Sequence, residues 1–253
     1  MIRLPQKKKK KKQPQHNNTY KANKKPESGK SFIIFIIIAV VAVAGLIYLL
    51  TKTAPVDDRP GSGANTVYDI STEGQPTLGN ADAKVSVVEF ADYKCPACRN
   101  WSMQVFPELK QNYIDTDKVS FHFVNFPFMS QNFKLPEDDS RYAALVGESI
   151  FQQNREAFWD YYKLVFENQG SESEVWATKE KIMGLAAEIE GIDLAKLEED
   201  ADKGTYNAEI EKDLQLVREA EVTVTPTILV NGKRIETPTY ENIAKAIEEE
   251  LEK

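Results

Sequence analysis

The residues best suited to chemistry are Cys95 and Cys98, the only cysteines in the 253-residue chain. Exchange of disulfides requires a thiolate that attacks a sulfur atom and a second thiol that resolves the mixed disulfide. Two cysteines separated by two residues supply both groups, and no further thiol is present that could form a wrong pair. The pair therefore predicts a redox-active centre.

Two other roles for the pair are weaker. A structural zinc site needs about four ligands, and beyond the cysteines the sequence offers only His16 and His122. His122 alternates with phenylalanines, so we expect a packed strand histidine there and no metal site at the cysteines. A purely structural disulfide is the other alternative, although closing so small a loop removes little entropy from the unfolded chain.

The flanking sequence predicts the elements that position the cysteines. Residues 85–90 are β-branched and mostly apolar, which is typical of a buried central strand. Pro96 suits a first helical turn, because its fixed φ fits there and its missing N–H is not needed. Cys95 then lies at the positive end of a helix, which favours a thiolate, and Cys98 lies one turn further on. We therefore expect Cys95 to be the nucleophile and Cys98 the more buried resolving thiol, with Ala97 between them offering no donor to a thiolate.

Glu89 is an acid within this apolar strand, six residues before Cys95. One interpretation is a solvated strand carboxylate. If the side chain is buried instead, its pKa is raised, and it could relay a proton to or from Cys98.

The rest of the domain alternates strands and helices. Asn231 and Gly232 supply the positive φ of a tight hairpin turn. The expected elements are a short strand at 67–70, turns at 74–82, the strand at 85–90, a helix from Pro96 to about Tyr113, a strand at 119–126, helices over about 137–200, a helix at 206–220, a hairpin at 227–235 and a helix at 240–251.

Thr225 and Pro226 directly precede the hairpin. Proline tolerates a cis peptide bond better than other residues. A plain turn proline is the alternative interpretation.

The combined pattern resembles the DsbA-like thiol–disulfide oxidoreductases, and among them the membrane-anchored Gram-positive BdbD type. The matching stretches are VSVVEFADYKCPAC, AFWDYYKLVFENQ and VTVTPTILVNGKRI. The resemblance covers about residues 74–250 and implies an α/β thioredoxin fold with a helical domain inserted at about 137–200. It also implies a buried acid at Glu89, a cis proline at 226 beside the cysteines, and a substrate-binding surface made of Pro96, Ala97, Thr225 and Pro226.

The same resemblance bears on the redox chemistry. Strongly oxidising members of that family carry His at the position of Ala97, so we expect the pKa of Cys95 to be lowered, but less than in those relatives. The resemblance further implies a DsbB-like membrane quinone reductase that re-oxidises the pair.

The first 65 residues predict delivery to a membrane. Residues 1–31 form a basic tail with net charge +10; the whole chain carries −7, so the remainder carries −17. Residues 32–50 are uncharged and long enough to span the ~30 Å hydrocarbon core as a helix. Lysines before the span predict a cytoplasmic N-terminus and a single-pass signal anchor; a cleaved signal peptide is the alternative. Residues 51–65 read as a flexible linker, and residues 66–253 as an extracytoplasmic domain.

These features predict a membrane-tethered oxidoreductase that introduces disulfides into reduced secreted or surface proteins. The acidic domain lacks the basic footprint of a nucleic-acid-binding protein. The alternatives are a thiol reductase, for example in cytochrome c maturation, and a tethered binding module with an inert disulfide. No cofactor is required beyond the Cys95–Cys98 disulfide, and a structural Ca²⁺ held by oxygen ligands is a further hypothesis without assigned ligands.

Overall fold

The computed structural model describes residues 66–253. The tail, signal anchor and linker predicted for residues 1–65 lie outside the described residues. Within 66–253, no helix has the length and apolar character that crossing a membrane requires.

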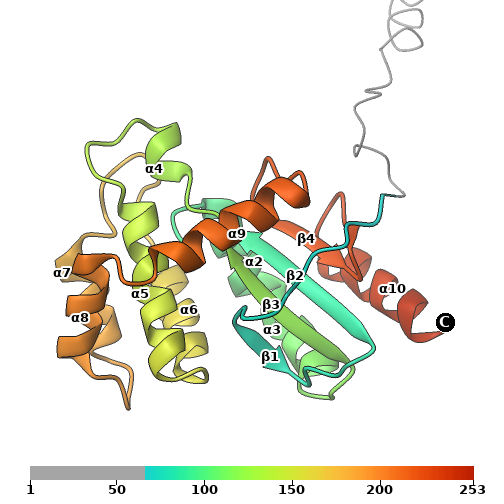
Figure 1. Cartoon of the computed structure of the whole chain (residues 1–253). Coiled ribbons are helices and arrows are strands. Elements are labelled where there is room, and N and C mark those ends of the chain that lie inside the picture. The colour runs from blue at the N-terminus through green and yellow to red at the C-terminus, as the bar shows by residue number, and fades with distance from the viewer. Residues whose placement is uncertain (1–65) are drawn as a thin grey trace, which may run out of the picture. The chain divides into compact units, whose positions relative to one another are not determined.

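Five strands form one mixed sheet in the order β1-β3-β2-β4-β5 (Figure 1). The central strand β2 (Val85–Ala91) pairs in parallel with β3 (Val119–Asn125) and antiparallel with β4 (Thr227–Val230). At the edges, β1 (Thr77–Gly79) and β5 (Lys233–Arg234) pair antiparallel with their neighbours. The near-continuous apolar run of β2 is explained by this central position, since helices cover both faces.

Helices connect and cover the strands. Their bounds are α2 (Pro96–Gln104), α3 (Phe106–Leu109), the π-helical turn η1 (Lys110–Ile114), α4 (Met129–Asn132), α5 (Asp139–Gln153), α6 (Ala157–Glu167), α7 (Lys179–Ala186), α8 (Leu194–Lys203), α9 (Asn207–Glu219) and α10 (Tyr240–Leu251).

Several helices begin at a residue whose side chain caps the first turn. Asp138, Thr178, Asp193 and Thr239 each accept a hydrogen bond from the backbone N–H three residues later. Such caps satisfy N–H groups that have no partner within the helix. Cys95 occupies the same position before α2, with sulfur in place of oxygen.

Side chains of β2 alternate between the two faces of the sheet. Val85 and Val87 pack in one core with residues of α2, η1 and α10, whereas Val88 and Phe90 pack in a second core with residues of α9. Because successive side chains of a strand point to opposite faces, Glu89 shares the face of Val85 and Val87, which is the face that α2 covers.

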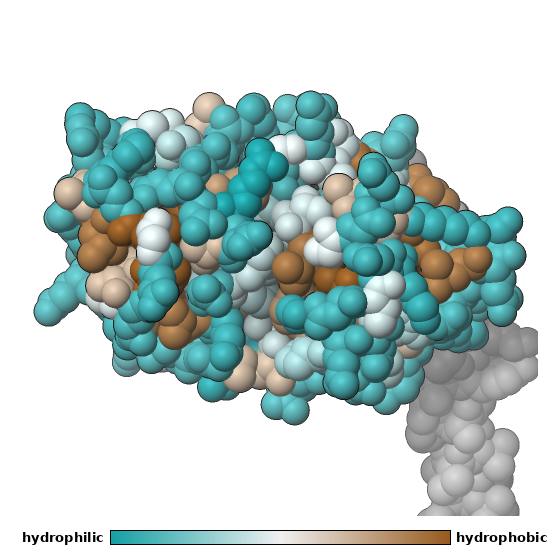
Figure 2. Space-filling model, turned by 90° about the horizontal axis from the view of Figure 1, so that it is seen from below, coloured by the Kyte–Doolittle hydropathy of each residue, from teal (hydrophilic) through white to brown (hydrophobic). Residues whose placement is uncertain are grey.

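Helices α5 to α8 form a group beside the sheet, and α9 runs from this group across the sheet (Figure 1). Their apolar side chains form a third core that also contains Tyr93, Cys95, Cys98 and Phe123. The cysteine pair therefore lies where the helical group meets the sheet. The face in Figure 2 is mostly hydrophilic, with hydrophobic patches separated by polar side chains.

The edge strand differs from the prediction. Residues 67–70 contribute only an isolated bridge between Val67 and Lys233, whereas Thr77–Gly79, expected within turns, forms β1. Gly79 has φ +88°, and a Cβ there would lie 2.6 Å from the carbonyl oxygen of Val119. The glycine that looked like a turn signal instead permits the close approach of β1 to the start of β3.

The helix predicted from Pro96 to about Tyr113 is also interrupted. It ends at Gln104 and resumes at Phe106, with Pro107 in the first turn of α3. A proline inside a helix cannot donate a backbone hydrogen bond and its ring collides with the preceding turn. The interruption lets Phe106 pack against Phe121, at a ring-centroid distance of 4.9 Å. The hairpin with Asn231-Gly232 and the helix at 240–251 are confirmed.

Candidate functional site

Cys95 and Cys98 lie together at the N-terminus of α2. The Cys95 Sγ caps this helix by accepting a hydrogen bond from the Cys98 N–H at 3.4 Å. Both cysteines are free thiols in this structure. Cys98 is fully buried, Cys95 is 5% exposed, and Pro96 and Ala97 between them are exposed. A macromolecular thiol can therefore approach the pair only from the side of Cys95, Pro96 and Ala97.

The environment separates the acidities of the two thiols. The pKa of Cys95 is lowered from 9.0 to about 6, chiefly by a hydrogen bond from the Cys98 side chain; burial opposes the shift, and the backbone N–H groups of Ala97 and Cys98 add to it. Burial raises the pKa of Cys98 well above its usual value. At neutral pH the reduced pair therefore holds a thiolate at Cys95 and a protonated thiol at Cys98.

Glu89 is fully buried on the α2 side of the sheet. Its Oε2 accepts a hydrogen bond from the Tyr162 hydroxyl at 2.9 Å, while its Oε1 has no hydrogen-bond partner. Burial raises the pKa of Glu89 to about 8, although the Tyr162 hydrogen bond opposes the shift. The charge of Glu89 in turn raises the pKa of Cys98. The solvated alternative for Glu89 is therefore excluded, and the carboxyl group can exchange a proton near neutral pH.

Tyr162 lies in the stretch AFWDYYKLVFENQ, within the helices expected over about 137–200, and the sequence assigned it no role at the site. It is buried in α6, and its hydroxyl reaches Glu89, 73 residues earlier in the chain. A tyrosine on an apolar helix face brings a hydroxyl that needs a partner when buried. A buried tyrosine in this helix therefore predicts a buried hydrogen-bond partner for its hydroxyl, but the spacing of residues in the sequence does not identify that partner.

Thr225 and Pro226 pack beside the nucleophile. The Thr225–Pro226 peptide bond is cis, and the Cys95 Sγ lies 3.4 Å from the Thr225 carbonyl oxygen, to which it donates when the thiol is protonated. Both residues are half-buried, and the preceding Val224 is 64% exposed. The structure thus brings Pro96, Ala97, Thr225 and Pro226, which the sequence assigned to substrate binding, to one surface around Cys95.

Two charged side chains of the loop between β2 and α2 are buried beneath the cysteines. The Lys94 Nζ donates to both carboxylate oxygens of Asp139, at 2.6 and 2.7 Å, and to the Glu174 carbonyl oxygen at 2.7 Å. Asp92 accepts hydrogen bonds from three backbone N–H groups, those of Lys94, Phe128 and Met129. These contacts, absent from our sequence interpretation, tie the cysteine loop to the helical group.

Gln169 adds a further contact from the end of α6. Its Nε2 donates to the carbonyl oxygens of Tyr93 at 2.7 Å and Cys95 at 3.0 Å. The backbone on the N-terminal side of the nucleophile is therefore held by side chains from the helical group.

His122 takes no part in this site. It faces away from Glu89 in β3, its ring nitrogens contact the hydroxyls of Thr77 and Ser120, and burial lowers its pKa to about 4. The prediction of a packed strand histidine is confirmed.

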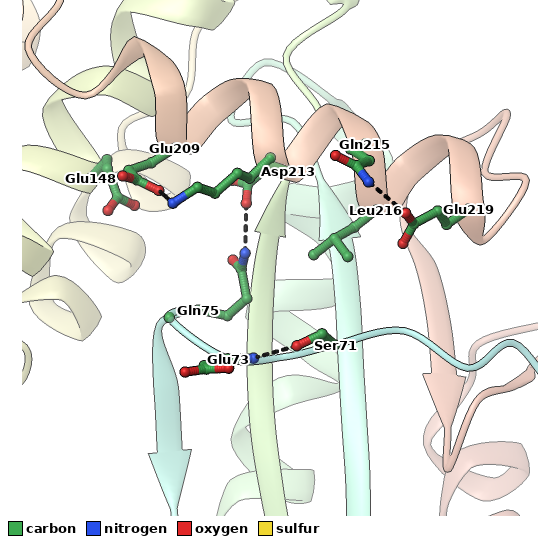
Figure 3. Close-up of a pocket in the computed structure, with 11 residues that line it drawn as sticks. Ser71, Glu73, Gln75, Glu148, Glu209, Asp213, Gln215, Leu216 and Glu219 are labelled. Carbon is green, nitrogen blue, oxygen red and sulfur yellow. Dashed lines mark hydrogen bonds and ion pairs between the residues drawn. The ribbon is translucent and has the colours of Figure 1, made fainter.

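A separate acidic cavity of about 300 Å³ lies between α9 and the segment before β1 (Figure 3). Asp213 accepts hydrogen bonds from the Gln75 side chain and from Asn125, and burial raises its pKa to about 6. Across residues 66–253, no cluster of three or more His, Cys, Asp and Glu side chains is arranged to hold a metal ion. The structural Ca²⁺ stays a hypothesis for which the structure names no ligand set.

Comparison with known proteins is consistent with this geometry. The family model described as thioredoxin matches residues 71–249. The chain is 33% identical over 234 residues to the probable disulfide bond formation protein D of Bacillus cereus, covering 92% of this chain and all of that protein. It is 38% identical over 182 residues to disulfide bond formation protein D of Bacillus subtilis, covering 72% of this chain and 79% of that protein.

The crystal structure of oxidised BdbD from Bacillus subtilis is similar in fold. It has a TM-score of 0.69 and 36% identity, and the match covers 74% of this chain and 98% of that one. The fold, the cysteine pair and the relatives therefore point to one family.

Proposed function

The chain belongs to the disulfide bond formation protein D family within the thioredoxin family, and from this premise we propose that its Cys95–Cys98 disulfide oxidises reduced secreted or surface proteins. Family membership makes the chain a protein thiol–disulfide oxidoreductase that forms disulfides. The observation that carries the proposal is the pairing of a low-pKa Cys95, 5% exposed beside the exposed Pro96 and Ala97, with a fully buried Cys98.

The reaction follows from this arrangement. A substrate thiolate attacks the Cys95 Sγ of the disulfide, and Cys98 leaves as a thiolate and takes a proton. A second substrate thiolate then attacks the substrate sulfur of the mixed disulfide, and Cys95 leaves as a thiolate. The substrate dithiol becomes a disulfide, and two electrons pass to the cysteine pair. Stabilising the Cys95 thiolate stabilises the reduced pair, which makes its disulfide the stronger oxidant.

The substrate is proposed to bind across Cys95 as an extended chain. Pro96, Ala97 and the exposed Val224 offer an apolar surface beside the sulfur, and the backbone of Thr225 can pair with the substrate backbone. Backbone pairing is independent of side-chain identity, which suits an enzyme that acts on many unfolded proteins.

The location is inferred from residues 1–65. The basic tail and the apolar residues 32–50 support a single-pass anchor with a cytoplasmic N-terminus. With this anchor, residues 66–253 would lie on the extracytoplasmic face, where disulfides persist. A DsbB-like membrane quinone reductase is the proposed partner that re-oxidises the pair.

Sealed membrane vesicles that carry the full-length chain test this proposal. Right-side-out vesicles should oxidise a reduced, unfolded protein added outside, and inverted vesicles should not. Free thiols of the added protein are counted over time with a membrane-impermeant reagent. Equal activity in both orientations would contradict the location, and no activity in either would contradict the oxidase function.

A further inference from the structure

A second cavity, separate from the substrate surface, lies between α2, α3 and α6. It measures about 310 Å³, its walls are largely apolar, and Phe106 and Trp159 contribute aromatic rings. Of its polar lining residues, Lys163 is exposed, whereas Ser102 and Tyr162 are 5% and 1% exposed. The cavity wall thus includes two buried residues that carry hydroxyl groups.

Those hydroxyls connect the cavity with the buried acid. The Tyr162 hydroxyl donates to the Glu89 Oε2 at 2.9 Å. Burial raises the pKa of Tyr162 well above its usual value, and the neighbouring Ser102 side chain opposes this shift. Ser102 lies one helical turn after Cys98 in α2. Four described titratable groups are coupled to Glu89, because one of each pair shifts the pKa of the other. They are Cys95 at the N-cap of α2, Cys98 in α2, Tyr162 in α6 and Tyr93 in the loop between β2 and α2.

The proposed oxidase reaction requires a proton to enter and leave this enclosed region. When the pair is re-oxidised, Cys95 first forms a mixed disulfide with the disulfide oxidant. The Cys98 thiol then loses its proton to the Glu89 carboxylate, its sulfur attacks the Cys95 Sγ, and the oxidant's sulfur leaves as a thiolate. When a substrate thiolate attacks Cys95, the departing Cys98 sulfur takes a proton back. Glu89 is fully buried, and a bound substrate covers the approach at Cys95. The proton therefore needs a second path between Glu89 and solvent.

We propose that Tyr162 and Ser102 connect Glu89 with solvent through this cavity, and that Tyr162 is a positioning residue for proton transfer to and from Cys98. The inference rests on the proposed oxidase function, since only turnover of the cysteine pair calls for this proton. The proton crosses from Glu89 to the two hydroxyls and then to water in the cavity, so the route lies on the α6 side and stays open while substrate occupies Cys95.

Tyr162→Phe tests the route, because it removes one hydroxyl and keeps the ring in place. Tyr161→Phe is the matched control, since Tyr161 is equally buried in α6 but donates to the Ala143 carbonyl oxygen at 2.7 Å. The full-length chain is assayed for oxidation of a dithiol peptide from pH 5 to 9, with oxidised glutathione as the terminal oxidant.

We expect Tyr162→Phe to turn over at least fivefold more slowly at pH 7 than Tyr161→Phe, as loss of assisted proton transfer costs tenfold or more in many enzymes. The Tyr162 hydrogen bond favours ionised Glu89, so its loss should also move the rise of turnover with pH to higher pH than in the wild type. A difference below fivefold with an unmoved pH profile would overturn the proton route.

The result separates this inference from the proposed function. A wild-type chain that fails to oxidise the peptide would contradict the oxidase function itself. A wild-type chain that is active beside an equally active Tyr162→Phe would contradict the route alone. Should Tyr162→Phe fail to fold, Ser102→Ala removes the outer hydroxyl at a less buried position, and it should lower turnover by at least twofold; no effect would overturn the route.

Discussion

Replacing Cys98 by Ala, with Cys95 first converted by oxidised glutathione to its glutathione mixed disulfide, should trap covalent complexes between Cys95 and reduced client proteins as glutathione leaves, whereas replacing Cys95 by Ala should trap none. Cys95 is the sulfur that an incoming thiol can reach, and it is the one that leaves readily as a thiolate. Without Cys98, a mixed disulfide at Cys95 has no neighbouring thiol to resolve it. Non-reducing electrophoresis followed by mass spectrometry of the linked peptides measures the complexes.

The complexes should be absent from Cys95→Ala and from the double variant, and they should disappear on treatment with reductant. The effect should be close to all-or-none, because Cys98 lies on the buried side of α2 and is fully buried. If Cys95→Ala accumulated complexes and Cys98→Ala did not, the roles of the two cysteines would be reversed.

Changing Asp139 to Ala should lower the free energy of unfolding by about 3–5 kcal/mol, the usual cost of leaving one partner of a buried ion pair uncompensated. Lys94 and Asp139 have exposed fractions of 0% and 2% and lie 2.6 Å apart. Removal of the carboxylate leaves a buried ammonium group with one described acceptor, the Glu174 carbonyl oxygen. Urea unfolding of a fragment that begins at residue 66 measures the loss.

Asp115→Ala is the control for this pair. Lys110 and Asp115 also lie 2.6 Å apart, but their side chains are 42% and 49% exposed, and such surface pairs contribute less than about 1 kcal/mol. The double change Lys94→Met with Asp139→Leu should recover much of the lost stability, since apolar pairs often replace buried ion pairs at little cost. If Asp139→Ala lowered the free energy of unfolding no more than Asp115→Ala does, the buried ion pair would not be important for stability.

The local part of the site could be predicted from the sequence. Pro96 after an apolar strand indicated where α2 begins, and this start alone places Cys95 at the cap and Cys98 one turn inside. The central strand, the hairpin at Asn231-Gly232 and the last helix follow from equally local rules of alternation and turn chemistry.

The remaining parts depend on contacts between distant segments. From the sequence alone, Lys94 would be taken for a solvent-exposed lysine. Only the structure shows that it contacts Asp139, 45 residues later. Tyr162 is likewise one of several aromatic residues in its helix, and only the fold brings its hydroxyl into contact with Glu89 of β2. Local rules do not state which distant residues meet, so neither the ion pair nor the proton route was predicted.

The reduction potential of the Cys95–Cys98 pair tests the central claim most directly. It is measured in the fragment that begins at residue 66, by equilibration with glutathione buffers at pH 7. An oxidase with a stabilised Cys95 thiolate should have a potential more positive than about −200 mV, toward the value of about −120 mV for DsbA. A potential at or below about −270 mV, the value for thioredoxin, would make the pair a reductant and contradict the account.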